Sequence, residues 1–379
     1  MSTQIVTRRT RWGPVLAVVG LATLLAGVAW AQSPEVDAPK QPIPVFKNVP
    51  VNPYSMPDLT SQQNLSVKHT GKIQEYSLTI EPIRWKIVGN VYMNQWGFNG
   101  QVPGPLLEAT EGDLVRISVK NNTTVNHTLH AHGIWTPTVM DGVPDMTQKP
   151  IAPGETFVYE FIAKPAGFHW YHCHVNAAEH LEMGLYGGFI VHPAPETGLG
   201  TTKEQAVDPA LKIDREYILI ADEMDTRIEE GKAGGVGLGH PRMIGNFNYF
   251  TINGKAFPET PMIYVREGET VRIRLLNVGS VVHSFHLHGH TFATSSAECD
   301  RCPRTWEYRD VINISPAQRL DIVFKANNPG RWMFHCHIPP HVTNDGVYPG
   351  GMMSMVEYEN NPYLKFLPPM EGHGMQHSK

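Results

Sequence analysis

The sequence has little of what marks several large classes of protein. Only 18% of its 379 residues are charged, the net charge is −5, and lysine and arginine do not cluster after the first dozen residues, so a nucleic-acid-binding surface is excluded. Long amphipathic helical patterns are absent, and no apolar run beyond the N-terminal one is long enough to span a membrane. Cysteine is scarce, with four residues, whereas histidine is abundant, with 19. Metal binding is the usual explanation of such a density of histidine.

The N-terminus has the composition of a signal peptide, residues 1–31. The adjacent arginines Arg8 and Arg9 precede an apolar run at 15–28, and Ala-Trp-Ala at 29–31 then supplies a small-residue cleavage site. The arginine pair also fits a twin-arginine signal, and an uncleaved membrane anchor is the alternative. We therefore expect a periplasmic or secreted protein whose mature chain has no membrane span.

The rest of the chain is predicted to be all-β. It contains 34 glycines and 31 prolines, which separate short segments of alternating β-branched or aromatic residues. The expected strands include Glu75–Glu81, Leu114–Lys120, Phe157–Phe161, Gly188–Val191, Glu216–Ala221, Met262–Val265, Val271–Leu276, Leu320–Phe324 and Met353–Tyr358. The expected organisation is a proline-rich arm at 32–58, a first domain at 59–195, a linker at 196–213, a second domain at 214–360, and a tail containing histidine and methionine at 361–379.

An internal repeat relates the two domains. Residues 111–133 share a pattern with residues 267–289 at a constant offset of 156. The triplet His-Cys-His at 172–174 matches the triplet at 335–337 at an offset of 163, so the second copy carries about seven extra residues, which we place near 298–306. One register held across several strands indicates two copies of one β-domain.

The first histidine motif of each copy suits metal ligation on two faces. In a strand, residues i and i+2 point to the same face, so His130 and His132 aim two imidazoles in one direction. His127 lies at an odd separation from His130 and faces the opposite side. The second copy repeats this motif with His283, His286 and His288.

The His-Cys-His triplets suit copper. His172 and His174 share a face and Cys173 faces the other way, which puts a thiolate at one metal and two imidazoles at others, joined by a short covalent path for an electron. Two histidines and one cysteine with a weak axial ligand form a blue-copper site. Such sites are predicted at His127, Cys173 and His180 in the first copy and at His283, Cys336 and His341 in the second.

The axial position of each blue-copper site has two candidates. Leu185 or Met183 would occupy it in the first copy, and Met352 or Met353 in the second, with Met352 preferred. A leucine there would leave copper without an axial donor and would raise its reduction potential.

These motifs resemble those of a two-domain multicopper oxidase, a relative of the laccases and the copper nitrite reductases, over residues 75–358. The resemblance implies two cupredoxin-like Greek-key β-sandwich domains, with type 1, type 2 and type 3 copper centres. It also implies a homotrimer in which domain 1 of one subunit meets domain 2 of the next. Because both cysteines are present, the resemblance is to relatives that have a type 1 copper in both domains.

The family pattern assigns the remaining histidines to a trinuclear cluster. His130 and His286 would bind the type 2 copper. The type 3 pair would be held by His132, His172, His174, His288, His335 and His337. Asp141 falls where the family has a carboxylate beside the cluster, which would supply protons to bound oxygen. The acid that the family often has after the last His-Cys-His triplet is missing here.

The resemblance implies oxidation of a small reducing substrate, of phenol type or a metal ion such as Cu(I), coupled to reduction of dioxygen to water. One alternative is a copper nitrite reductase, which has an aspartate about where His130 stands. The other is a non-enzymatic copper-sequestering or electron-transfer protein. Cys299 and Cys302, in the extra segment, are expected to form a local disulfide, with a redox or metal site as the alternative.

Overall fold

The computed structural model describes residues 72–194, 213–227, 247–295 and 306–367. The expected signal peptide and arm, nearly all of the linker, Cys299 and Cys302, and the end of the tail lie outside the described residues. Among the helices within the described ranges, none is long and apolar enough to cross a membrane.

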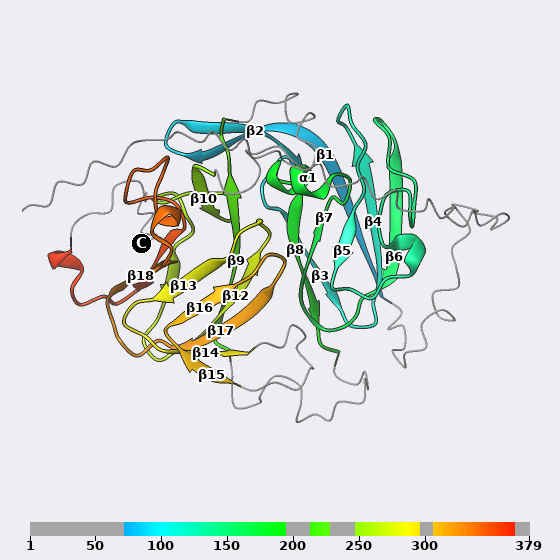
Figure 1. The fold of residues 1–379 in the computed structure, drawn as a ribbon. Helices are drawn as coiled ribbons and strands as arrows, with labels where there is room; N and C mark the ends of the chain where they lie inside the picture. Colours follow the sequence, from blue (N-terminus) through cyan, green and yellow to red (C-terminus); the bar gives the residue numbers. More distant parts are fainter. Residues whose placement is uncertain (1–71, 195–212, 228–246, 296–305, 368–379) are drawn as a thin grey trace, which may run out of the picture. The chain divides into compact units, whose positions relative to one another are not determined.

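The first domain consists of two four-stranded sheets (Figure 1). Its strands are β1 (Ile73–Val88), β2 (Val91–Phe98), β3 (Gly104–Thr110), β4 (Leu114–Asn121), β5 (His130–His132), β6 (Thr156–Ile162), β7 (Gly167–His172) and β8 (Tyr186–His192). One sheet has the order β2-β1-β4-β6 and the other the order β3-β8-β7-β5. Its connections hold the 3-10 helix η1 (Thr138–Met140) and the α-helix α1 (Ala177–Glu182).

The second domain also consists of two sheets. Its strands are β9 (Arg215–Met224), β10 (Tyr249–Ile252), β11 (Ile263–Val265), β12 (Thr270–Asn277), β13 (His283–Leu287), β14 (Phe292–Ser295), β15 (Glu307–Arg309), β16 (Val311–Ile314), β17 (Arg319–Lys325), β18 (Arg331–Cys336) and β19 (Met353–Tyr358). The sheet orders are β10-β9-β12-β17-β14-β15 and β11-β19-β18-β13-β16. The 3-10 helices η3 (Pro339–Val342) and η4 (Leu364–Phe366) complete the domain.

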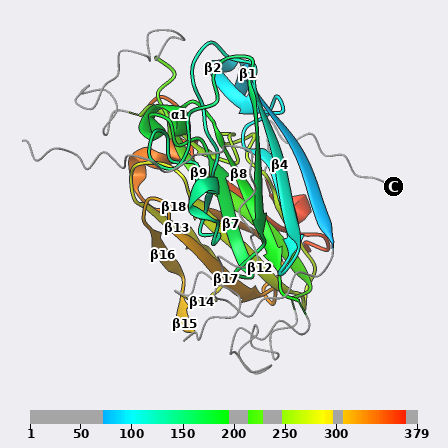
Figure 2. The same ribbon diagram turned by 90° about the vertical axis from the view of Figure 1, so that its right-hand side faces the viewer.

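Strand pairing reproduces the sequence repeat. β1 runs parallel to β4, as Figure 2 shows, and β9 runs parallel to β12 in the same way. β3 pairs with β8 as β11 pairs with β19, and β5 pairs with β7 as β13 pairs with β18. The second domain differs in having β14, β15 and β16 between β13 and β17, around the place predicted for its extra residues.

Alternating side chains build a separate core in each domain. In β4, Val115, Ile117 and Val119 are fully buried while Arg116 and Ser118 between them are partly exposed. Burial of one such apolar side chain stabilises the fold by roughly 1.5–3 kcal/mol. Every strand predicted from the sequence overlaps an observed strand, so the all-β prediction is confirmed.

Candidate metal centres

One cysteine and two histidines converge in the first domain. Cys173 follows the end of β7, and His180 lies on α1. The Cys173 sulfur lies 3.5 Å from His127 Nδ1 and 3.1 Å from His180 Nδ1, and all three side chains are buried. Trp96 packs edge-on against both imidazoles, with ring centroids 5.1 and 4.9 Å away. Because the sulfur and one nitrogen of each imidazole lie within 4.8 Å of one another, one metal ion could be bound by all three.

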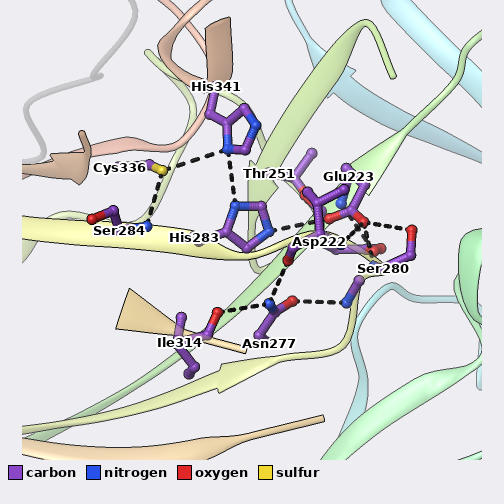
Figure 3. A network of polar contacts seen from close by, with 12 residues as sticks. Asp222, Glu223, Thr251, Asn277, Ser280, His283, Ser284, Ile314, Cys336 and His341 are labelled. Carbon is purple, nitrogen blue, oxygen red and sulfur yellow. Dashed lines mark hydrogen bonds and ion pairs between the residues drawn. The ribbon is translucent and has the colours of Figure 1, made fainter. Parts of the chain in front are cut away.

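The second domain repeats this group. His283 Nδ1 lies 3.1 Å from His341 Nδ1, and His341 Nδ1 lies 3.5 Å from the Cys336 sulfur (Figure 3). His341 stacks on Phe250 with 4.1 Å between ring centroids. It is partly exposed, whereas its counterpart His180 is buried. The two groups therefore share a donor set but differ in access to solvent.

Backbone hydrogen bonds give Leu185 and Met352 equivalent places. The Leu185 carbonyl accepts from the N–H of the cysteine in its group at 3.1 Å, and its own N–H donates to the carbonyl of the α1 histidine at 3.0 Å. Met352 makes the same two bonds with the cysteine and the last histidine of its group, both at 2.9 Å. Both side chains are fully buried. The axial assignment stays a prediction, and this equivalence supports Leu185 over Met183 and Met352 over Met353.

Four imidazoles of the first domain gather at β5 and the end of β7. The ring centroid of His130 lies 5.6 Å from that of His132, 5.3 Å from that of His172 and 5.5 Å from that of His174. Trp170 stacks on His132 and His172 at 4.7 and 4.4 Å. One nitrogen each from His130, His132 and His172 lies within 4.8 Å of the other two, so these residues also form a candidate metal group.

The four matching imidazoles of the second domain have the same arrangement. The ring centroid of His286 lies 4.7 Å from that of His288, 5.8 Å from that of His335 and 5.6 Å from that of His337. The Nε2 atoms of His288 and His335 approach to 3.0 Å. All four side chains are at least partly exposed. Each domain thus presents half of the predicted set of eight.

Backbone carbonyls orient these imidazoles. His130 Nδ1 donates to the Asp141 carbonyl at 2.6 Å, and His286 Nδ1 donates to the Asp310 carbonyl at 2.7 Å. The Nδ1 atom of the first histidine in each His-Cys-His triplet donates to the carbonyl of the following cysteine at 2.9 Å. Such bonds leave Nε2 as the nitrogen that can bind a metal.

Asp310 is the counterpart of Asp141 and was not among the residues predicted from the sequence. Its carbonyl has the same role, and with His286 and His337 it lines a surface pocket of about 420 Å³. Asp141 follows its histidine by 11 residues, but Asp310 follows His286 by 24 because β14 and β15 intervene. The changed spacing conceals the equivalence in the sequence.

The first histidine of each cysteine group has a partner at its outer nitrogen. His127 Nε2 lies 2.8 Å from the Thr123 hydroxyl, whereas His283 Nε2 lies 3.1 Å from the Glu223 carboxylate (Figure 3). Burial by itself would raise the pKa of Glu223, but hydrogen bonds from His283 and Ser280 hold that pKa below its ordinary value. An acidic residue near the end of the mostly apolar strand β9 was the available sequence signal for Glu223.

Burial also sets the protonation of the candidate ligands. It lowers the pKa of His127 and His172 to about 3, and that of His180 and His341 to about 4. It raises the pKa of the Cys173 thiol to about 12. In the metal-free protein near pH 7 these imidazoles are therefore neutral and the thiol is protonated, so metal binding displaces the thiol proton.

Comparison with known proteins identifies the family. Two family models described as multicopper oxidase match residues 79–196 and 239–360. The chain belongs to the multicopper oxidase family. This multicopper oxidase is 38% identical to the blue copper oxidase from Nitrosomonas europaea, whose structure matches 76% of this chain and 86% of that chain with a TM-score of 0.67. It is 33% identical to the multicopper oxidase mgLAC, over 81% of this chain and 91% of that chain, with a TM-score of 0.68.

A curated relative is longer. Dihydrogeodin oxidase from Aspergillus terreus (strain NIH 2624 / FGSC A1156) is 31% identical over 306 residues, which cover 73% of this chain and 47% of that protein. The chain thus spans less than half the length of this curated relative. The shared structures give both domains of this multicopper oxidase the cupredoxin fold, and the family implies copper centres. Paired imidazoles with a buried thiol suit copper, so the residues present fit the metal.

We expect the buried imidazoles to make a contribution to the stability of the metal-free protein that is lost as the pH falls below 6.5. Unfolded histidines take up protons there, whereas the buried imidazoles stay neutral until the pH approaches 4 or 3, so acid favours the unfolded chain. Each such group contributes up to about 1.4 kcal/mol per pH unit. Urea unfolding at pH 7 and pH 5 measures the effect. His127→Leu removes one of these groups and should weaken the pH dependence; an unchanged dependence in this variant would contradict the assignment.

Proposed function

We propose that the protein couples one-electron oxidation of a reducing substrate to reduction of dioxygen to water. One observation carries the proposal. In each domain, a cysteine that belongs to a two-histidine group is flanked by two histidines that belong to a separate imidazole set. Copper bound to these residues would supply one-electron transfer at the cysteine groups and dioxygen reduction at the imidazole sets. A protein that only stores copper has no need for this linkage.

The chain itself provides the path between the two kinds of group. Cys173 is joined by backbone bonds to His172 and His174, and the His172 Nδ1 donates to the Cys173 carbonyl at 2.9 Å. Cys336 has the same relation to His335, also at 2.9 Å. Each cysteine thus connects its two-histidine group to one half of the imidazole set through a few bonds.

The exposure of His341 suggests where the substrate donates electrons. Of the two imidazoles that close the cysteine groups, His341 is partly exposed and His180 is buried. A reducing substrate, of phenol type or a metal ion such as Cu(I), would therefore transfer electrons at the second domain. A signal peptide at residues 1–31 would export the enzyme to the periplasm or the medium, where such substrates are met.

Asp141 and Asp310 would hold and deliver protons. Both carbonyls orient histidines of the imidazole set, and the Asp141 carboxylate lies 3.4 Å from His130 Nδ1. The Asp310 side chain is exposed and lines the pocket with His286 and His337. Asp310 would fill the role of the acid that is missing after the last His-Cys-His triplet.

The enzyme would be a homotrimer. Each domain offers four imidazoles, and in the second domain they are partly or fully exposed on the chain. Copper ions bound by the second domain alone would have only half of the eight predicted histidine ligands. The first domain of a neighbouring subunit would supply the other four. Head-to-tail contacts of this kind close into a ring.

Oxygen uptake by the copper-loaded protein tests the function. We expect uptake with a phenol or with Cu(I) as the reductant, and no nitric oxide production from nitrite. Cys173→Ser combined with Cys336→Ser should abolish uptake because both paths are broken. Nitric oxide production from nitrite would favour the nitrite reductase alternative, and copper binding without either reaction would favour sequestration.

The role of Asp310 is tested with Asp310→Asn, which keeps the backbone carbonyl but loses the titratable group. We expect oxygen reduction at least tenfold slower, with the largest loss at high pH, and unchanged blue absorption. Glu307→Gln, an exposed acid on β15, is the matched control. An Asp310→Asn enzyme with the control's activity and pH profile would remove Asp310 from the mechanism.

Complementation between inactive subunits tests the trimer. One variant carries His130→Ala and His132→Ala, and the other carries His335→Ala and His337→Ala, so each retains one intact half. When the two are mixed, subunit exchange should pair the intact halves and restore activity. Mixtures that stay inactive, although native mass spectrometry shows that subunits exchange, would mean that both halves come from one chain.

A further inference from the structure

The two cysteine groups differ at one hydrogen bond. In each, the first histidine turns Nδ1 toward the other donors and Nε2 away from them. The acceptor at Nε2 is a neutral hydroxyl, that of Thr123, in the first domain and a carboxylate, that of Glu223, in the second. The sequence repeat would suggest two identical sites, and this contact makes them chemically unequal.

The Thr123 hydroxyl carries no formal charge. It donates to the Asn121 side-chain oxygen at 2.8 Å and is also near the Val125 carbonyl at 3.1 Å. Asn121 is fully buried and ties together the loop before His127, since its amide donates to the carbonyls of Val125 and Ile151 at 2.7 and 2.8 Å. The hydroxyl therefore positions the His127 imidazole without adding a charge.

Glu223 brings a charge into the same place. Its side chain is 0% exposed, and one carboxylate oxygen faces His283 Nε2 while the other accepts from the N–H and hydroxyl of Ser280 and from the Val281 N–H at 2.9 Å (Figure 3). Asn277, the counterpart of Asn121, holds this loop through bonds to the Val281 and Ile314 carbonyls. Several donors thus fix the carboxylate against the imidazole.

We propose that Glu223 is a positioning residue that lowers the reduction potential of the second-domain copper relative to the first. A carboxylate that accepts the imidazole N–H makes the ring a stronger donor and places negative charge near the metal, which favours Cu(II) over Cu(I). In the buried site this charge is poorly screened. The inference rests on the proposed function only in requiring a blue copper in each domain.

The Glu223 contact predicts different reduction potentials for the two copper sites. The second-domain group is the more solvent-accessible and would have the lower potential, while the first-domain group is buried under Trp96 and has a neutral partner. The Leu185 and Met352 difference acts in the same direction. The effect of Glu223 must therefore be measured within one domain.

Potentiometric titration of the copper-loaded protein, followed by the blue absorption, makes that measurement. Cys173→Ser leaves only the second-domain site to observe. Adding Glu223→Gln to this parent should raise the equilibrium constant for reduction of the second-domain copper at least tenfold. For one electron this is an upward shift of the reduction potential by about 59 mV. The matched control adds Thr123→Val to a Cys336→Ser parent, which leaves only the first-domain site, and should shift its potential less than Glu223→Gln shifts the other.

Ser280→Ala is a second variant that retains Glu223. Ser280 is exposed, so this change is mild, and it removes one donor that disperses the carboxylate charge. In the Cys173→Ser parent it should move the potential in the opposite direction from Glu223→Gln. If the Glu223→Gln variant fails to bind copper, the test of the inference is the direction in which Ser280→Ala shifts the reduction potential of the second-domain copper.

Each result has one meaning. The inference is supported if Glu223→Gln raises the equilibrium constant for copper reduction more than threefold, or if Ser280→Ala shifts the potential downward. The inference is overturned if Glu223→Gln shifts the potential downward or raises the equilibrium constant for reduction threefold or less. When Ser280→Ala decides alone, an upward or absent shift overturns it. Either result leaves the proposed function intact. A Cys173→Ser parent that binds copper without blue absorption overturns both, because the second domain would then have no type 1 site.

Discussion

Alternation of side chains at the ends of β7 and β18 is the constraint on which the candidate centres depend. Cys173 points into its domain, where His127 and His180 meet it, while His172 and His174 point to the opposite side. One backbone segment therefore belongs to two groups at once. Moving the triplet by one residue would exchange the faces and separate the sulfur from its histidines. Cys336 is under the same constraint.

Duplication explains how one constraint builds two sites, and its imperfections explain why they differ. Parallel pairing of β1 with β4 and of β9 with β12 places the loops before His127 and His283 in equivalent positions, each held by a buried asparagine. The partner of the outer nitrogen is not the same in the two domains. Thr123 comes from the loop itself, whereas Glu223 comes from β9, so the two domains could diverge there without disturbing the ligands.

Local periodicity and repetition made much of the fold and of the candidate centres predictable from the sequence. The strands, the two cysteine groups and the two imidazole halves all come from regular spacing within short segments, and the structure brings each set together. Asp310 and Glu223 could not be predicted in this way. Asp310 is displaced by the strands inserted after β13, and Glu223 reaches His283 across 60 positions through the pairing of separate segments. Contacts of that kind depend on tertiary packing, which leaves no period in the sequence.

Imidazoles from the two duplicated domains would share one group of copper ions, with each half connected through a cysteine to a mononuclear site. A crystal structure of the copper-loaded protein, with anomalous scattering recorded at the copper absorption edge, tests this arrangement most directly. We expect a trinuclear group of peaks between the first-domain and second-domain histidines of neighbouring subunits, and a single peak beside each cysteine. Isolated peaks bound by the histidines of one domain alone would contradict the arrangement.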